Sequence, residues 1–274
     1  MILRHKPFIV CVAGIGILVK IPDASITQQI QVHYLPFIEK ILPDIRVTVK
    51  FIETQGQPAY HEARLTFMEK RVIFEHPGYH GWIDLTRQEA YLECGFAFAF
   101  ESIDYFIRVI CAFMVFHRKG ILVHAAGVLR GESVYLFLGH SGSGKTTTSR
   151  NSPDGLVLND DLVVLLPEAG RWHAHSTPFW SPTQVKPNPG NGPVVGFFHL
   201  VKDKRVFLEP MSPGQALGEW ITNIPVITSD PKLGFEVLSM GKIITTEIPS
   251  FKLHLLPDST FWQELDRVIG LQIC

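Results

Sequence analysis

The 274-residue sequence predicts an α/β protein in which a strand-rich N-terminal region (1–100) precedes a domain of strands and helices (101–274). Three observations support this prediction. Short segments with alternating polar and apolar residues recur before residue 100, a long apolar helix follows, and a glycine-rich segment then separates a strand from a helix. Hydrophobic residues make up 46% of the chain, so a large core can be buried. The sequence leaves open whether the two parts form one continuous unit.

The charge and the cysteines exclude several classes of protein. The net charge of −1 provides no electrostatic footprint for nucleic acid or for an acidic membrane surface. The cysteines are far apart and form no C-x-x-C pair, which argues against a zinc site or a disulfide framework; they are Cys11, Cys94, Cys111 and Cys274. We therefore expect a cytoplasmic protein with reduced thiols and without nucleic-acid or membrane partners.

The first expected element is a buried hairpin over residues 8–19. The apolar run follows a basic start and so resembles a secretory signal peptide. However, Gly14 and Gly16 interrupt the run, Lys20 ends it, and no clear small-residue cleavage site follows. A hairpin is the better interpretation.

Three further strands are expected in the N-terminal region. Residues Arg46–Ile52 alternate between polar and apolar types, as in a half-buried strand. Residues Arg71–Glu75 and Gly81–Leu85 are bounded by turn residues such as Pro77-Gly78. No catalytic constellation stands out, which favours a scaffold or a specificity role for this region.

An apolar helix over Ser102–Arg118 is expected to open the second domain, with Gly120 as its stop signal. Its apolar stretch is too short to cross a bilayer. A strand over Ile121–Leu129, a turn at Arg130–Ser133 and a second strand over Val134–Leu138 are expected to follow.

The second of these strands leads into Gly139-His140-Ser141-Gly142-Ser143-Gly144-Lys145-Thr146, which fits the phosphate-binding pattern G-x-x-x-x-G-K-[ST]. Glycines let the backbone curl so that its N–H groups point at phosphate oxygens. The lysine reaches the β- and γ-phosphates, and the hydroxyl holds Mg²⁺. A glycine-rich turn could match by chance, but the preceding strand favours the functional interpretation. The candidate nucleotide-binding residues are Gly139, Ser141, Gly142, Ser143, Gly144, Lys145, Thr146 and Thr147.

A pair of carboxylates follows at the distance where such a loop needs one. A short helix ends at Ser152–Gly155, a strand runs over Gly155–Asn159, and Asp160 and Asp161 lie at its end. One carboxylate can hold Mg²⁺ while the other accepts the proton of an attacking hydroxyl. Taken alone, this segment would be a polar turn between strands. Beside the glycine-rich loop, a magnesium-dependent site is the better interpretation.

Three histidines and one long loop complete the set of candidates. If the strands before and after Arg130–Ser133 pair, His124 lies toward the loop end of the sheet, either near the γ-phosphate or as a satisfied core residue. His173 and His175 could share one face of a strand, but a metal site would need further ligands. Residues 182–193 form a proline- and glycine-rich loop of the kind that often binds ligands or covers a site.

The remaining expected elements are strands over Val194–Val201, Lys204–Leu208 and Phe251–Leu256, a helix over Pro213–Thr222, and a final helix from Ser259 or Thr260 through Val268.

His124, then Gly139–Thr146, then Asn159-Asp160-Asp161, in this order, resemble the catalytic domain of HPr kinase/phosphorylase. The chain is most similar to the short HPr-kinase-related proteins, also at Thr177–Trp180, at Val195–Leu200 and near Phe261-Trp262; the resemblance covers about 120–274. It implies a mixed-sheet phosphate-loop domain of the type shared with phosphoenolpyruvate carboxykinase.

The resemblance also implies roles for individual residues. Gly142, Gly144 and Lys145 would bind the triphosphate of ATP, and Thr146 would coordinate Mg²⁺. Asp160 would be the catalytic base, Asp161 the Mg²⁺-linked carboxylate, and His124 a neighbour of the transferred phosphate. The catalytic residues it implies are therefore Asp160, His124 and Lys145.

The chain departs from that family at several points. Ala125-Ala126-Gly127 follows His124 where the HPr enzymes usually have His-Gly, and Thr147 stands where they usually have Glu. Their downstream signature has no match. These departures argue against HPr as the acceptor and against reverse phosphorolysis.

The sequence thus predicts an ATP- and Mg²⁺-dependent kinase that phosphorylates a hydroxyl, either a Ser or Thr of a peptide or small protein or a small metabolite. A nucleotide-binding regulator and an NTPase without an acceptor are the alternatives. The sequence does not choose between ATP and GTP, and it leaves a homo-oligomer open.

Overall fold

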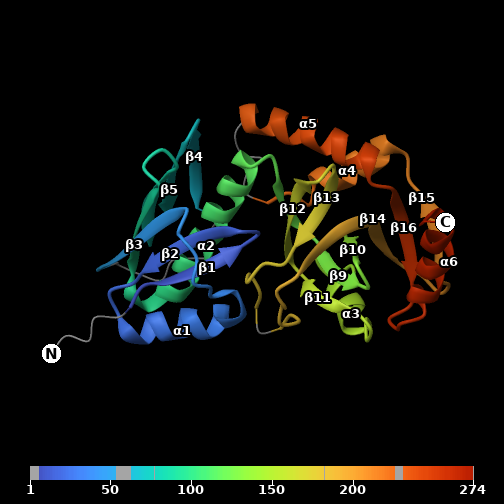
Figure 1. Cartoon of the computed structure of the whole chain (residues 1–274), viewed down its shortest axis with the longest axis horizontal. Helices are drawn as coiled ribbons and strands as arrows, with labels where there is room; N and C mark the ends of the chain where they lie inside the picture. The colour runs from blue at the N-terminus through green and yellow to red at the C-terminus, as the bar shows by residue number, and fades with distance from the viewer. Residues whose placement is uncertain (1–5, 54–62, 77, 182, 226–230, 274) are drawn as a thin grey trace. The chain divides into compact units, whose positions relative to one another are not determined.

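The computed structural model describes residues 6–53, 63–76, 78–181, 183–225 and 231–273. The chain divides into two compact units, Met1–Met114 and Val115–Cys274, and Figure 1 labels many of their helices and strands. Both are mixed α/β units rich in strands, and the sheet of each contains parallel as well as antiparallel pairs. The division falls inside helix α2 (Ala99–His117).

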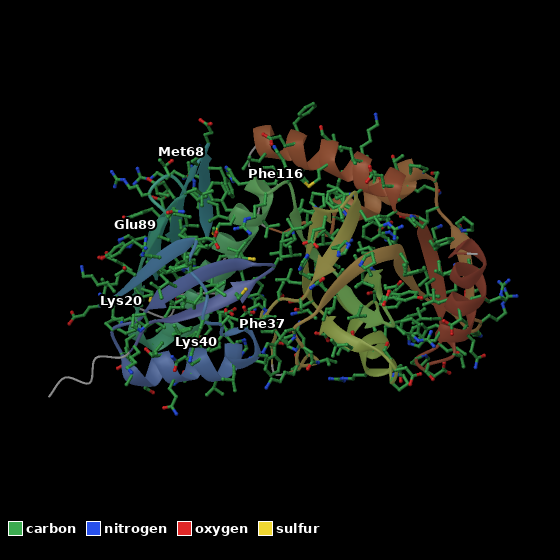
Figure 2. All side chains as sticks on the ribbon, in the orientation of Figure 1. Lys20, Phe37, Lys40, Met68, Glu89 and Phe116 are labelled. Carbon is green, nitrogen blue, oxygen red and sulfur yellow. The ribbon has the colours of Figure 1, made fainter. Side chains whose placement is uncertain are left out.

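The described residues of the N-terminal unit form a seven-stranded sheet in the order β1-β2-β3-β7-β6-β5-β4. Its strands are β1 (Phe8–Val12), β2 (Ile15–Lys20), β3 (Ile45–Ile52), β4 (Arg64–Met68), β5 (Arg71–His76), β6 (Tyr79–Asp84) and β7 (Glu89–Gly95). Helices α1 (Ala24–Tyr34) and α2 and the 3₁₀ turns η1 (Leu35–Phe37) and η2 (Phe96–Phe98) complete it. Charged residues at strand ends, such as Lys20 and Glu89, project to the outside of the unit (Figure 2).

The expected hairpin is confirmed, because β1 and β2 pair antiparallel from Phe8 opposite Val19 to Val12 opposite Ile15. The two-residue turn between them needs positive φ, and Ala13 and Gly14 lie at 50° and 69°. No helix in the described parts of the chain combines the length and the apolar character that a membrane span requires. The turn at Pro77-Gly78 falls partly outside the described residues.

Helix α1 was not predicted, although its signals are present in the sequence. The Asp23 carboxylate accepts a hydrogen bond from the Ile26 N–H at 2.9 Å and so caps the helix. Ile26, Ile30 and Tyr34 recur every four residues and are buried. The Tyr34 hydroxyl donates to Asp104 of α2, and burial raises the pKa of Tyr34 well above its ordinary value. This buried hydrogen bond ties α1 to α2.

The C-terminal unit has strands in the order β11-β9-β10-β14-β13-β12-β8, with β16 pairing with both β14 and β15. Its strands are β8 (Ile121–His124), β9 (Ala126–Arg130), β10 (Ser133–Leu138), β11 (Leu156–Asn159), β12 (Leu162–Glu168), β13 (Arg171–His175), β14 (Asn191–Lys202), β15 (Phe207–Pro210) and β16 (Ser250–Leu255). Its helices are α3 (Lys145–Arg150), α4 (Pro213–Ile221), α5 (Pro231–Glu247) and α6 (Phe261–Ile273).

Three expectations for this unit need correction, and one helix was missed. The strand expected over 121–129 is two strands, because the chain changes partners at Ala125 from β12 to β10 and β11. The last three residues of the loop expected over 182–193 already belong to β14, and Pro182 lies outside the described residues. Strand β15 lies later than the expected 204–208, and α5 was not predicted.

One hydrophobic cluster of this unit joins α6 to the strands that carry the site. Phe137 of β10 packs against Phe261 and Trp262 of α6, and Phe198 of β14 stacks on Phe251 of β16 in the same cluster. Burial of aromatic side chains of this size supplies a large part of the apolar stabilisation of a domain. The ends of β10 and β14 are therefore held on a rigid base.

Candidate functional site

Two neighbouring chain crossings bring the expected site residues together. The chain passes between the β8–β12 pair and the β9–β11 pair twice, once after His124 and once at Asp160-Asp161. The register places Leu162 opposite His124 and Asn159 opposite Gly127. The two crossings therefore lie side by side, and His124 is next to the carboxylates.

The glycine-rich loop, Gly139–Thr146, starts at the same place. Strand β10 pairs antiparallel with β9, and its Phe137 lies opposite Ala126, directly after the first crossing. Since β10 ends one residue later, at Leu138, the loop leaves the sheet beside both crossings. Three segments that are distant in sequence thus meet at one point.

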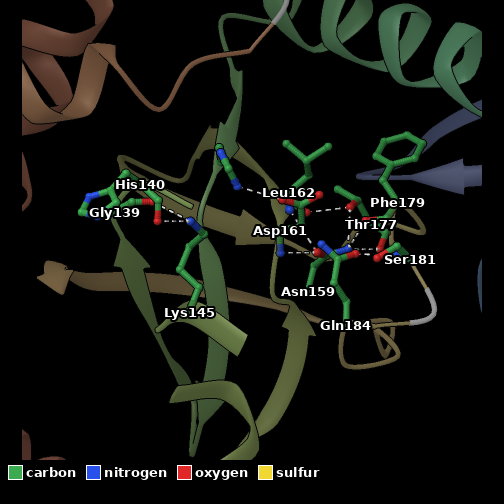
Figure 3. Close-up of polar contacts among 11 residues, drawn as sticks. Gly139, His140, Lys145, Asn159, Asp161, Leu162, Thr177, Phe179, Ser181 and Gln184 are labelled. Atoms are coloured by element: carbon green, nitrogen blue, oxygen red, sulfur yellow. Dashed lines mark hydrogen bonds and ion pairs between the residues drawn. The ribbon is translucent and has the colours of Figure 1, made fainter. Parts of the chain in front are cut away.

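Asn159 fixes the turn that carries Asp160 and Asp161, and Figure 3 shows its contacts with Asp161, Leu162, Thr177 and Phe179. Its Nδ2 donates to the carbonyls of Thr177 and Phe179 at 3.0 and 2.9 Å. Its Oδ1 accepts the backbone N–H groups of Asp161 and Leu162 at 2.6 and 3.0 Å. Asn159 is fully buried, so its removal would take all four of these hydrogen bonds out of the interior. The buried Asn159 side chain therefore stabilises this turn.

The backbone of the glycine-rich loop has the curled conformation that the pattern predicts. Gly139, Gly142 and Gly144 have φ values of 146°, 79° and 118°, which L side chains rarely adopt. A Cβ on Gly139 would lie 2.6 Å from the Ser143 hydroxyl oxygen, so the loop also folds closely on itself there. Helix α3 begins at Lys145.

Lys145 is only 8% exposed and points back at the start of the loop (Figure 3). Its ammonium donates to the carbonyl oxygens of Gly139 and His140 at 2.5 and 3.4 Å. Burial lowers the pKa of Lys145, and the nearby carboxylates of Asp161 and Asp160 oppose that shift. The loop therefore holds a poorly hydrated cation against its first residues.

Asp160 is the more buried carboxylate, at 2% exposure. Burial raises its pKa, while hydrogen bonds from the Thr146 hydroxyl and the Val185 N–H act in the opposite direction. The Val185 N–H donates to Oδ2 at 3.2 Å. Among the described residues, Oδ1 has no hydrogen-bond partner. A buried carboxylate oxygen of this kind is suited to a cation or to a proton.

Asp161 turns the other way and contacts His124. The distance from His124 Nε2 to Asp161 Oδ1 is 2.8 Å, and the pair is partly exposed to solvent. The backbone N–H of His124 donates to the Asn223 carbonyl at 2.7 Å, which fixes the end of β8. His124 is thus neither isolated in the core nor remote from the loop.

These groups line an open pocket of about 270 Å³. Its lining residues are His124, Ser141, Gly142, Gly144, Lys145, Thr146, Thr147, Asp160, Asp161, Gln184 and Lys202. Gly139 and Ser143, also expected to bind nucleotide, do not line it and instead shape the loop from behind.

Gln184 and Lys202 were not predicted. Lys202 ends a long buried strand on the loop side of the sheet, and residues at the carboxyl ends of strands often form ligand sites in α/β proteins. That signal could have found Lys202 once the strand was extended to residue 202. Gln184 belongs to the proline-rich loop, where no pattern singles it out.

The residues around Asp160 fit Mg²⁺ by chemical type. Asp160, Asp161 and Thr146 offer hard oxygen donors, and Mg²⁺ is usually held by one or two carboxylates together with substrate phosphates and water. No group of three or more His, Cys, Asp or Glu side chains in the described part of the chain could hold a metal ion alone. Magnesium would therefore depend on a bound phosphate.

His173 and His175 lie outside this pocket. Both are on β13 and both contact Glu168, at 3.4 and 2.8 Å. Burial lowers the pKa of His175, and the Glu168 carboxylate opposes the shift.

Comparison with known proteins shows distant similarity to solved structures. The solved structure of the HPr(Ser) kinase/phosphatase from Coxiella burnetii is similar to this chain, with a TM-score of 0.32 and 11% sequence identity. The match covers 56% of this chain and 90% of that chain. No family model matches the sequence, and no curated protein matches it. At this level the similarity assigns neither a family nor an activity.

Proposed function

We propose that this chain is an ATP- and Mg²⁺-dependent kinase that transfers the γ-phosphate to a hydroxyl group. One observation carries the proposal: Lys145, Thr146, Asp160, Asp161 and His124 line one pocket at the end of β10. Phosphoryl transfer is catalysed mainly by positioning and by neutralising charge, and this set of side chains can do both. The acceptor is a Ser or Thr of a peptide or small protein, or a hydroxylated metabolite.

Burial and contacts support the proposed roles. The Lys145 ammonium offsets negative charge on the phosphates. Asp160 accepts the proton of the acceptor hydroxyl, and burial supports this role because it makes the carboxylate more basic than usual. His124 holds Asp161 in place through the 2.8 Å contact.

Magnesium is held by Thr146 and Asp161 in this proposal. When bound, it supplies charge neutralisation for the phosphates of the nucleotide. The glycine-rich loop orients those phosphates through its backbone N–H groups, with Gly142 and Gly144 providing the curvature.

One observation favours a second candidate, a nucleotide-binding regulator without transfer chemistry. The Val185 N–H donates to Asp160 at 3.2 Å, so the proline-rich loop is attached to the pocket. A ligand that competes for this carboxylate oxygen could release the loop toward a partner. Intact carboxylates at both positions favour the kinase.

The test follows the fate of a labelled γ-phosphate. The protein is incubated with Mg²⁺ and γ-labelled ATP or GTP, together with a Ser/Thr peptide library or a set of hydroxylated metabolites. A kinase places the label on an acceptor. Release as free phosphate would indicate an NTPase, and label that stays on the nucleotide despite tight binding would indicate the regulator.

Asp160→Asn provides the site-specific control. We expect nucleotide binding to persist and transfer to fall about 10²-fold or more, since the variant cannot accept a proton. Asp154→Asn, at an exposed carboxylate outside this pocket, should transfer at the normal rate. Unchanged turnover in Asp160→Asn would remove the assignment of the base.

A further inference from the structure

We infer that Lys202 is a second phosphate-binding cation, which contacts the terminal phosphate of the bound nucleoside triphosphate. This inference rests on the proposed function. Lys202 is the last residue of β14, which pairs parallel with β10. The register ends with Leu138 opposite His199. Lys202 therefore extends beyond the end of β10, beside the first residues of the glycine-rich loop.

The strand order separates Lys202 from the carboxylates. Strand β10 lies between β9 and β14. The two chain crossings reach the loop at the start of β9 and the end of β11, whereas Lys202 ends β14, the strand on the other side of β10. All of these residues nevertheless line the same pocket. A ligand over the loop would therefore meet the carboxylates on one side and Lys202 on the other.

The position of Lys145 identifies the phosphate concerned. Its ammonium hydrogen-bonds to the carbonyls of Gly139 and His140, at the start of the loop. In loops of this pattern the lysine reaches the β- and γ-phosphates, while backbone N–H groups cradle the α- and β-phosphates. Because Lys202 is also beside the start of the loop, it lies at the γ-phosphate end.

Lys202 adds positive charge to the pocket. When only the Asp and Lys side chains of the lining are counted, two carboxylates face two ammonium groups, so these side chains without Lys202 would be net negative toward a polyanionic ligand. The nearest acid in sequence, Asp203, is engaged elsewhere: it contacts His254 at 2.9 Å and accepts the Lys204 N–H at 2.6 Å. Lys202 itself is exposed at the rim. It is therefore available to a ligand.

The experiment compares the affinities of a triphosphate and a diphosphate by isothermal titration calorimetry, with the magnesium complexes of AMP-PNP and ADP. For Lys202→Met we expect AMP-PNP to bind about tenfold more weakly and ADP to bind within about twofold of the parent protein, because one charge-assisted contact is lost at the terminal phosphate only. Lys202→Arg should keep most of the preference for the triphosphate.

Lys204→Met is the matched control, since it removes an exposed lysine two residues away that does not line the pocket; both affinities should stay unchanged. The inference is wrong if Lys202→Met binds AMP-PNP as tightly as the parent protein does. It is also wrong if Lys202→Met loses the same affinity for AMP-PNP and for ADP. Lys145→Met separates the two proposals. If it binds both nucleotides normally, the proposed function itself fails; if it binds neither while Lys202→Met behaves like the parent, only the role of Lys202 fails.

Discussion

His124 Nε2 and Asp161 Oδ1 lie 2.8 Å apart because two chain crossings are adjacent. His124 ends β8, Asp161 precedes β12, and these strands pair with Leu162 opposite His124. The contact is therefore set by strand register rather than by closeness in sequence. It places an imidazole next to the carboxylate that is proposed to hold magnesium.

Replacing His124 should impair transfer more than nucleotide binding. In His124→Ala the Asp161 carboxylate loses the group that orients it, and we expect the rate of phosphoryl transfer to fall about 10- to 100-fold. The affinity for the magnesium–nucleotide complex should fall by less. The rate is measured with labelled ATP, and the affinity by calorimetry.

His140→Ala is the control for His124, because His140 is an exposed residue of the loop and does not line the pocket. It should transfer at the parent rate. An unimpaired His124→Ala would show that His124 has only a packing role.

Asn159→Ala should destabilise the fold through the turn that carries the carboxylates. It removes the hydrogen bonds that the Asn159 side chain makes with the N–H groups of Asp161 and Leu162 and with the carbonyls of Thr177 and Phe179. The expected loss in the free energy of unfolding is about 2–4 kcal/mol, measured by urea denaturation.

Asn151→Ala removes an asparagine that makes one exposed hydrogen bond, to the Pro257 carbonyl at 3.2 Å. It should cost less than about 1 kcal/mol. Similar losses for Asn159→Ala and Asn151→Ala would contradict a structural role for the buried amide network.

Gly139→Ala should disrupt the glycine-rich loop. The new Cβ would lie 2.6 Å from the Ser143 hydroxyl oxygen, and φ at this position is 146°. We expect nucleotide affinity to fall at least about tenfold, because the loop must shift to relieve the contact. Gly131→Ala tests strain alone: φ there is 61°, but no atom lies within 4 Å of the new Cβ. Gly131→Ala should lose about 1 kcal/mol of stability and bind nucleotide normally. If Gly131→Ala and Gly139→Ala lose the same affinity for nucleotide, the steric explanation is wrong.

Local patterns predicted most of the secondary structure of the C-terminal unit. Strand β10, the short helix after the loop and the strand before Asp160 are confirmed, since each has a clear apolar run and a stop signal. The break at Ala125 was missed because residues 121–129 form one continuous apolar stretch. Only the pairing of β8 with β12 and of β9 with β10 and β11 divides it.

Strand pairing also limited what the sequence could predict about the site. The types of Lys145 and Thr146 and their spacing pointed to phosphate chemistry, and Asp160 and Asp161 followed from the chemistry of magnesium. The contact between His124 and Asp161 could not be predicted, because it depends on strand register. Lys202 was missed for a related reason: only the three-dimensional arrangement of β14 beside β10 brings it to the loop.

The stability of the protein should depend on pH because of His199, a buried histidine of β14 that lies opposite the end of β10. It is 6% exposed, and within the described residues its Nδ1 has no hydrogen-bond partner. Burial lowers its pKa from 6.5 to about 4. Because the folded-state pKa is depressed, the contribution of His199 to stability is complete above pH 6.5 and is lost as the pH falls through about 4.

Urea unfolding at pH 7 and pH 4.5 tests this, with His199→Leu as the variant and His140→Leu, at an exposed histidine, as its control. Between these pH values the parent protein should lose about 2 kcal/mol more than His199→Leu, because the leucine has no proton to take up on unfolding. His140→Leu should lose as much as the parent protein, since an exposed imidazole is hydrated in both states. If His199→Leu and the parent protein lose the same free energy, then His199 becomes charged without unfolding the protein, and the end of β14 beside the glycine-rich loop must admit water.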